Sequence, residues 1–109
     1  MNDFFKNKVV AVTGGSDGIG KALIELLLPM GAKVATCARN QDKLYDLQVR
    51  HSTLPLHCVV ADVSNYNDCA LFINSTIKQF GGIDILINNA GISMRSLLKD
   101  AELDVFKKV

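Results

Sequence analysis

Residues 8–20 read KVVAVTGGSDGIG, and this stretch decides the fold. It begins with a β-branched apolar run, Lys8–Thr13, which predicts a buried strand. The strand leads into a loop with glycines in a G-x-x-x-G-x-G pattern, at Gly14, Gly18 and Gly20. A phosphate group needs backbone N–H groups at close range, where side chains would obstruct it. A strand, a glycine loop and a helix in this order therefore predict a site for the pyrophosphate of a dinucleotide.

Each of the three glycines has its own expected task. Gly14 permits the tight turn off the strand, Gly18 lets backbone amides approach the pyrophosphate, and Gly20 lets the helix pack close to the sheet. The partial positive charge at the N-terminus of the helix adds to the attraction. A glycine-rich turn without a ligand is the alternative, and the strand–loop–helix context favours the cofactor site.

Outward from this loop, short apolar runs alternate with amphipathic stretches. Apolar residues at helical spacing predict a first helix over Ile19–Met30, which Gly31 ends and which Pro29 is expected to shorten. Asn40 and Ser64 are expected to cap a second and a third helix, and another helix is expected to begin near Asp100. Further strands are expected at Lys33–Cys37, Leu56–Ala61 and Ile83–Ile87. This order predicts an α/β fold: a Rossmann-like, doubly wound parallel sheet, incomplete, with its first four strands and flanking helices.

Composition and charge exclude several functional classes. The 109 residues carry 12 Lys+Arg against 11 Asp+Glu, a net charge of +1, which gives no basic face for nucleic acid. The first residues mix both charge signs without an apolar run, so neither a leader peptide nor a membrane association is expected. We expect one domain or a part of one.

The cysteines and histidines predict neither a disulfide framework nor a metal site. Cys37, Cys58 and Cys69 have no C-x-x-C spacing and are expected to be small buried thiols in a reducing cytoplasm. His51 and His57 lack a clustered second ligand, so they are expected to be surface or strand residues.

The residues after the second strand bear on the choice of cofactor. An acid about 20 residues past the glycines would bind the ribose 2′-hydroxyl of NAD. Here the chain has Arg39, whose guanidinium favours a 2′-phosphate, so NADP is expected and NAD is the less favoured choice. A solvated arginine at a helix start is the alternative. Asp17 complicates the choice because it adds negative charge near a phosphate.

Three motifs together resemble the short-chain dehydrogenase/reductase family. They are T-G-x-x-x-G-I-G at Thr13–Gly20, Asp62-Val63 after the third strand, and N-N-A-G at Asn88–Gly91. The chain looks most similar to reductase members with Gly-Ile-Ser-Met-Arg after N-N-A, here Gly91 to Arg95. The resemblance covers essentially the whole chain and implies the strand order 3-2-1-4.

The resemblance also implies roles for single residues. Asp62 would accept a hydrogen bond from the adenine amino group beside the Val63 backbone, whereas the alternative is that it only caps a turn. Ser16 and Arg39 would lie near the 2′-phosphate. Thr13 and Asn88 would tie the first and fourth strands together, and Asn89, Ala90 and Gly91 would pass along the adenosine ribose. The expected cofactor-binding residues are Gly14, Ser16, Asp17, Gly18, Ile19, Gly20, Arg39, Asp62, Val63, Asn89, Ala90 and Gly91.

The family's chemistry is hydride transfer between a nicotinamide and an alcohol or carbonyl, with a Tyr and a Lys spaced as Y-x-x-x-K. Here Tyr45 is followed four residues later by Val49, and Tyr66 by Ala70. No catalytic residue is therefore assigned, and the relay asparagine would be expected a few residues past residue 109. The 109-residue chain alone is expected to be inactive, marginally stable and prone to associate through the apolar edge at Ile83–Ile87.

Three interpretations follow from this pattern. We expect residues 1–109 to be the N-terminal cofactor-binding part of a longer NADP-dependent oxidoreductase, truncated before its catalytic half. In its complete form that protein would act on a small alcohol or carbonyl substrate as a cytoplasmic homo-oligomer. The alternatives are a short, non-catalytic nucleotide-binding or interaction module, or a decayed remnant.

Overall fold

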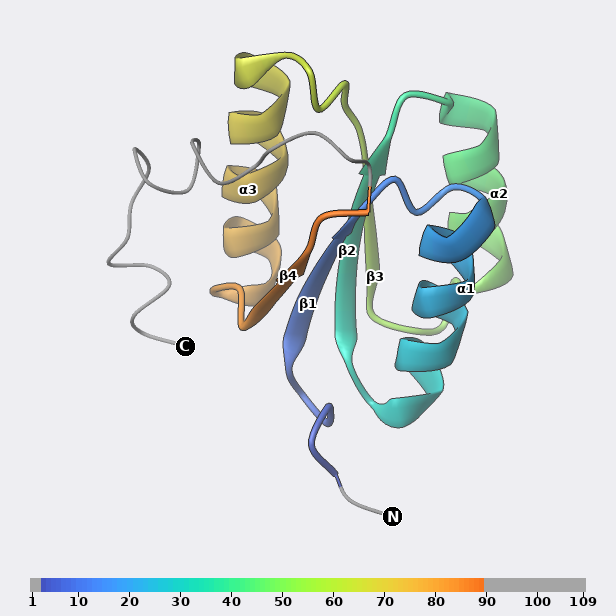
Figure 1. The fold of residues 1–109 in the computed structure, drawn as a ribbon. Helices are drawn as coiled ribbons and strands as arrows, with labels where there is room; N and C mark the ends of the chain where they lie inside the picture. The colour runs from blue at the N-terminus through green and yellow to red at the C-terminus, as the bar shows by residue number, and fades with distance from the viewer. Residues whose placement is uncertain (1–2, 90–109) are drawn as a thin grey trace.

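The structure is a computed structural model that describes residues 3–89. Strands and helices alternate along the chain (Figure 1). The elements are β1 (Val9–Thr13), α1 (Gly18–Leu27), η1 (Leu28–Met30), β2 (Lys33–Ala38), α2 (Gln41–Arg50), β3 (Leu56–Val60), α3 (Tyr66–Phe80) and β4 (Ile85–Ile87).

The strands form a parallel sheet in the order β3-β2-β1-β4. β1 lies inside the sheet and pairs with β2 on one side and β4 on the other, so Val10 faces both Val34 and Ile85 across the ladder. The chain moves outward from β1 to β3 and then returns to the opposite side of β1. This arrangement confirms the expected doubly wound α/β fold and its strand order.

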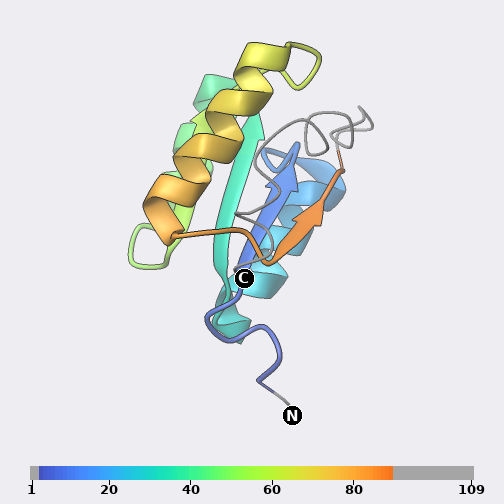
Figure 2. The same cartoon turned by 90° about the vertical axis from the view of Figure 1, so that its left-hand side faces the viewer.

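Helices cover both faces of the sheet. Alternate residues of β1 point to opposite faces, so each set packs under a different group of helices. Val9 and Ala11 pack in the core cluster that contains Phe72 of α3. Val10 and Val12 pack in the cluster that contains Ile24 of α1 and Leu47 of α2. Figure 2 shows α3 in front of the sheet, with α1 and α2 behind it. The fully buried strand sequence of β1 therefore supports two separate cores.

Local signals set most helix ends where they are expected. α1 ends at Leu27, and the following turn around Pro29 is a 3₁₀ helix, since proline cannot donate a backbone hydrogen bond there. Gly31 follows with a φ of 90°, a left-handed conformation that suits glycine. The Asn40 side chain accepts a hydrogen bond from the Lys43 backbone N–H at 3.0 Å and caps α2.

The expected cap of the third helix was wrong. The N-cap of α3 is Asn65, whose side chain accepts from the Asp68 N–H at 3.0 Å. Ser64 instead donates to the Asp62 carboxylate from its N–H and its hydroxyl, at 2.9 and 2.6 Å. The turn begun by Asp62 therefore occupies Ser64, and the helix starts one residue later.

Strand boundaries differ by a residue or two from those expected. β1 begins at Val9, β2 extends to Ala38, β3 stops at Val60 and β4 begins at Ile85. Ile83 is 2% exposed and belongs to the core on the α3 side, so its apolar character comes from packing before the strand begins. The helix expected near Asp100 lies outside the described residues.

Candidate functional site

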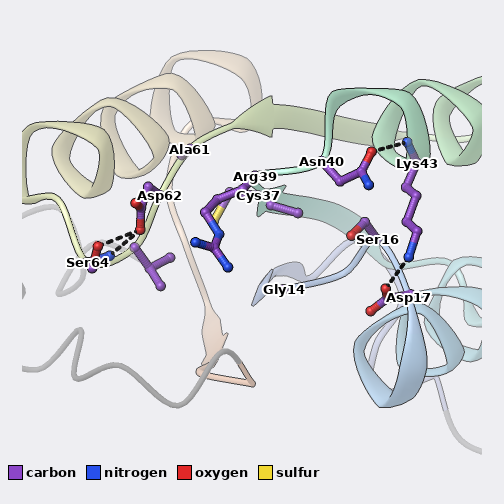
Figure 3. A pocket seen from close by; sticks show the side chains of 12 residues that line it. Gly14, Ser16, Asp17, Cys37, Arg39, Asn40, Lys43, Ala61, Asp62 and Ser64 are labelled. Atoms are coloured by element: carbon purple, nitrogen blue, oxygen red, sulfur yellow. Dashed lines mark hydrogen bonds and ion pairs between the residues drawn. The ribbon is translucent and has the colours of Figure 1, made fainter.

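A pocket of about 470 Å³ lies at the carboxyl ends of β1, β2 and β3 (Figure 3). In open parallel sheets this edge is where ligands bind. Three segments build the pocket: the glycine loop after β1, the end of β2 with the start of α2, and the segment that joins β3 to α3. The lining residues are Gly14, Ser16, Asp17, Cys37, Ala38, Arg39, Asn40, Lys43, Ala61, Asp62, Val63 and Ser64.

Two glycines give the loop its shape. Gly14 has a φ of 70° and makes the turn that leaves β1. A Cβ on Gly20 would collide with the Gly14 carbonyl oxygen and would lie 2.7 Å from Nδ2 of Asn89. The close approach expected at Gly20 is thus made to the glycine loop and to the end of β4. A methyl group at this position would displace backbone atoms rather than a flexible side chain.

Strand ends hold the loop in place from both sides. The Gly14 N–H donates to the Cys37 carbonyl of β2 at 2.8 Å. The Asn89 side chain donates to the Gly14 carbonyl at 3.2 Å, and Thr13 donates to Asn88 at 3.0 Å. The expected tie between the first and fourth strands is therefore confirmed, and Asn89 extends it to the loop.

An ion pair crosses from the glycine loop to α2. Nζ of Lys43 lies 2.7 Å from a carboxylate oxygen of Asp17, and both side chains face solvent. The hydrogen bond and the charge of Lys43, with a smaller contribution from the Lys21 charge, lower the pKa of Asp17 below its ordinary value. Asp17 is the N-cap residue of α1, yet its carboxylate makes no hydrogen bond to the first turn of that helix. Its charge is directed to Lys43 instead.

Asp62 and Arg39 occupy the other side of the pocket (Figure 3). The two hydrogen bonds from Ser64 lower the pKa of Asp62, and the nearby positive charge of Arg39 lowers it further. The Asp62 backbone N–H in turn donates to Asp68 at 2.8 Å. An ionised acceptor and an exposed cation therefore lie together at the ends of β3 and β2.

The pocket gathers some of the expected residues and not others. Gly14, Ser16, Asp17, Arg39, Asp62 and Val63 line it. Gly18, Ile19 and Gly20 belong to the first turn of α1, where the Ile19 side chain is 73% exposed. Asn89 acts through its bond to Gly14, and Ala90 and Gly91 lie outside the described residues.

The sequence alone did not indicate that Lys43 lines the pocket or that Gly15 has a packing role. A Cβ on Gly15 would collide with Thr36 of β2 and Ile24 of α1, so the second loop glycine permits close packing. The adjacent glycine pair in the motif was a usable signal for Gly15. Lys43 had no comparable signal, because its partner lies 26 residues earlier in the chain.

Two residue types considered from the sequence do not supply chemistry here. Cys37 lines the pocket, but burial raises the pKa of its thiol to about 12, so it stays neutral. Tyr45 and Tyr66 are 71% and 59% exposed on α2 and α3, and neither lines the pocket. Between residues 3 and 89, no helix has the length and apolar character needed to cross a membrane.

Comparison with known proteins identifies the fold's relatives. The sequence profile of the short chain dehydrogenase family matches residues 8–109. The chain belongs to the short-chain dehydrogenase family. An uncharacterized oxidoreductase of Staphylococcus aureus strain USA300 is 38% identical over 98 residues, which cover 90% of this chain and 42% of that protein. This short-chain dehydrogenase chain therefore spans less than half the length of that relative.

Solved structures of other proteins superpose on this fold. Glucose dehydrogenase of Caenorhabditis elegans superposes with a TM-score of 0.74 at 36% identity, over 84% of this chain and 41% of that one. An NADPH-bound short chain oxidoreductase of Pseudomonas aeruginosa PAO1, described as having an atypical catalytic center, gives a TM-score of 0.71 at 40% identity. That match covers 79% of this chain and 35% of the other.

Proposed function

We propose that this chain forms the NADP-binding part of a short-chain dehydrogenase that transfers hydride between the nicotinamide and an alcohol or carbonyl substrate. Family membership supports the reaction class, and the chain's coverage of 42% of its S. aureus relative supports a longer whole. The part described here binds the adenosine and pyrophosphate of the cofactor. We place residues 1–109 in the N-terminal part of one dinucleotide-binding domain, in a cytoplasmic enzyme whose thiols stay reduced.

The residues of the pocket fit the adenosine half of the cofactor. The glycine loop and the start of α1 offer backbone N–H groups for the pyrophosphate, and a Cβ added at Gly18 would meet no atom within 4 Å. Asp62 accepts from the adenine amino group, beside the backbone of Val63. We assign Asn89, which follows β4, to the adenosine ribose, and Ala90 and Gly91 lie outside the described residues. Bound NADP supplies the hydride chemistry, and this chain orients its adenosine end.

The observation that carries the proposal is the position of Arg39. It follows β2 directly, lines the pocket and is exposed, as a residue that binds a ribose 2′-phosphate must be. An acid there would prefer the ribose hydroxyl of NAD. A charge-assisted guanidinium–phosphate contact contributes about 1.5–3 kcal/mol, which corresponds to roughly 10- to 150-fold in affinity.

Titration calorimetry with two small probes tests the assignment. Adenosine 2′,5′-bisphosphate and adenosine 5′-monophosphate differ only in the 2′-phosphate and need only the adenosine side of the site. We expect the protein to prefer the bisphosphate, and Arg39→Ala to lose that preference while binding of the monophosphate changes less than about twofold. Arg50→Ala is the matched control, because Arg50 pairs with Glu25 and Asp46 and does not line the pocket. Equal losses for both probes would contradict the assignment.

A further inference from the structure

The Asp17–Lys43 pair presents an unusual charge arrangement at a phosphate site. Asp17 places a carboxylate in the glycine loop, where it repels the phosphates of a dinucleotide. Lys43 neutralises that carboxylate from α2 across 2.7 Å. Figure 3 shows the Lys43 side chain extending from α2 toward Asp17, along the part of the pocket that Ser16 and Asn40 also line. Lys43 therefore lies in the same pocket as Arg39 while its ammonium is held by an acid.

The Asp17–Lys43 ion pair is weak enough for Lys43 to leave Asp17 for a more strongly charged anion. The side chains of Lys43 and Asp17 are 51% and 66% exposed, and ion pairs exposed to this degree contribute little to stability because water screens them. A phosphate monoester carries nearly two negative charges and three acceptor oxygens. Its attraction for an ammonium group therefore exceeds that of one solvated carboxylate.

The backbone position of Lys43 favours this exchange. Its N–H is bound by the Asn40 side chain in the cap of α2, so the residue is anchored directly after the segment that contains Arg39. The side chain beyond that anchor is a flexible four-carbon stem whose ammonium has three donors. The ammonium can thus turn between the glycine loop and the mouth of the pocket without moving the helix.

We propose that Lys43 is a second specificity-determining cation of the 2′-phosphate subsite, released from Asp17 when a 2′-phosphate binds beside Arg39. This inference rests on the proposed function, since it assumes that the pocket takes the adenosine end of NADP. Asp17 acts as the competing partner in the free protein. It thereby reduces the preference for a 2′-phosphate that Arg39 and Lys43 provide together.

The test compares binding of adenosine 2′,5′-bisphosphate with that of adenosine 5′-monophosphate in four variants. Lys43→Gln should weaken the bisphosphate about tenfold and leave the monophosphate within about twofold. Asp17→Asn keeps the size of the side chain and should raise the preference for the bisphosphate about two- to fivefold. The double variant should show the same preference as Lys43→Gln, because Asp17 can affect the preference only by holding Lys43. The loss caused by Lys43→Gln and the gain caused by Asp17→Asn should both shrink at 1 M salt.

Lys21→Gln is the matched control. Lys21 is a second lysine whose charge acts on Asp17, but it does not line the pocket. We expect it to leave the preference unchanged. If Lys21→Gln and Lys43→Gln behave alike, the effect is one of general charge and the inference is overturned. The same holds if Lys43→Gln weakens both probes equally, which would mean that Lys43 only keeps Asp17 away from the phosphates.

The two proposals fail in different ways. If the wild-type protein shows no preference for the bisphosphate, the NADP assignment falls, and the inference falls with it. If Arg39→Ala removes the preference while Lys43→Gln keeps it, only the inference falls.

Discussion

At the scale of single residues, Gly20 shows how a missing side chain builds the site. Its Cα lies against the Gly14 carbonyl that also accepts the hydrogen bond from Asn89. One backbone oxygen thus marks the meeting point of the loop, of α1 and of the end of β4. Any atom added at Gly20 separates these three elements, so this position sets the packing of the loop that we propose binds the cofactor.

Gly20→Ala is expected to destabilise the protein by about 1–3 kcal/mol, because the methyl group must displace backbone atoms. It should also weaken adenosine 2′,5′-bisphosphate binding by tenfold or more, because the loop moves with them. Urea unfolding followed by circular dichroism measures the first effect, and calorimetry measures the second.

Gly81→Ala separates the two effects. Gly81 has a φ of 90° but no atom within 4 Å of an added Cβ, so the substitution brings only backbone strain, about 1–2 kcal/mol. We expect it to lower stability without changing binding. Wild-type binding by Gly20→Ala would contradict the account given for Gly20.

Residues recognisable by their place in a motif could be predicted, and residues that act through distant partners could not. The place of Arg39 in the pocket was predictable because it directly follows a strand at a fixed distance from the glycines. Lys43 looks like any lysine on a solvated helix, and only the docking of α2 beside the glycine loop brings it to Asp17. Gly15 likewise depends on where Thr36 lies in β2.

At the scale of elements, β3 and α3 are joined by a polar contact inside a mainly apolar layer. Nε2 of His57 lies 2.6 Å from the Ser75 hydroxyl, and its ring meets Phe80 edge-to-face at 6.2 Å between centroids. Burial lowers the pKa of His57 below its ordinary value of 6.5. The folded protein therefore favours the neutral imidazole, and protonation of His57 at acid pH destabilises the folded protein.

This lowered pKa gives the protein a pH dependence with a definite sign. Between the lowered folded-state pKa and 6.5 the unfolded chain binds more protons at His57 than the folded chain does. Stability should therefore fall as the pH falls from 6.5 through the folded-state value. His57→Gln keeps a polar side chain without titrating there, so the difference in unfolding free energy between wild type and variant should change across this window. A constant difference from pH 8 to pH 5 would contradict the assignment.

The elements themselves were largely predictable, and their ends less so. Apolar runs and glycine stops placed every strand and helix of residues 3–89 to within a few residues. The N-cap of α3 was missed because Ser64 and Asn65 are both good capping residues. The choice between them depends on Asp62, which engages Ser64 only once the turn has formed.

At the scale of the whole molecule, two cores share one sheet. Strand order was predictable because alternating strands and helices with right-handed crossovers leave few arrangements. The core on the α3 side is built around Phe72, which is fully buried, whereas its neighbour Leu71 is 54% exposed. These adjacent residues of one helix report separately on core packing and on the surface.

Phe72→Ala is expected to reduce the free energy of unfolding by about 3–5 kcal/mol, through lost burial and a residual cavity. Leu71→Ala, the matched surface change in the same helix, should alter it by no more than about 0.5 kcal/mol. Urea denaturation of both variants measures the contrast. Similar losses in the two variants would mean that α3 packs through a different face.

Three hydrogen bonds between the ends of the described chain have a consequence for its synthesis. Val9 donates to Asp84, Thr13 to Asn88, and Asn89 to Gly14, and each bond joins residues 75 positions apart. The glycine loop leaves the ribosome well before β4, and the Asn89 side chain that secures it is made 75 positions later. A nascent chain therefore carries the glycine loop without these bonds until β4 has emerged and paired with β1. During that interval the loop has only its contacts with β2, α1 and α2, and we expect a nucleotide to favour folding fully only after the fourth strand has been translated.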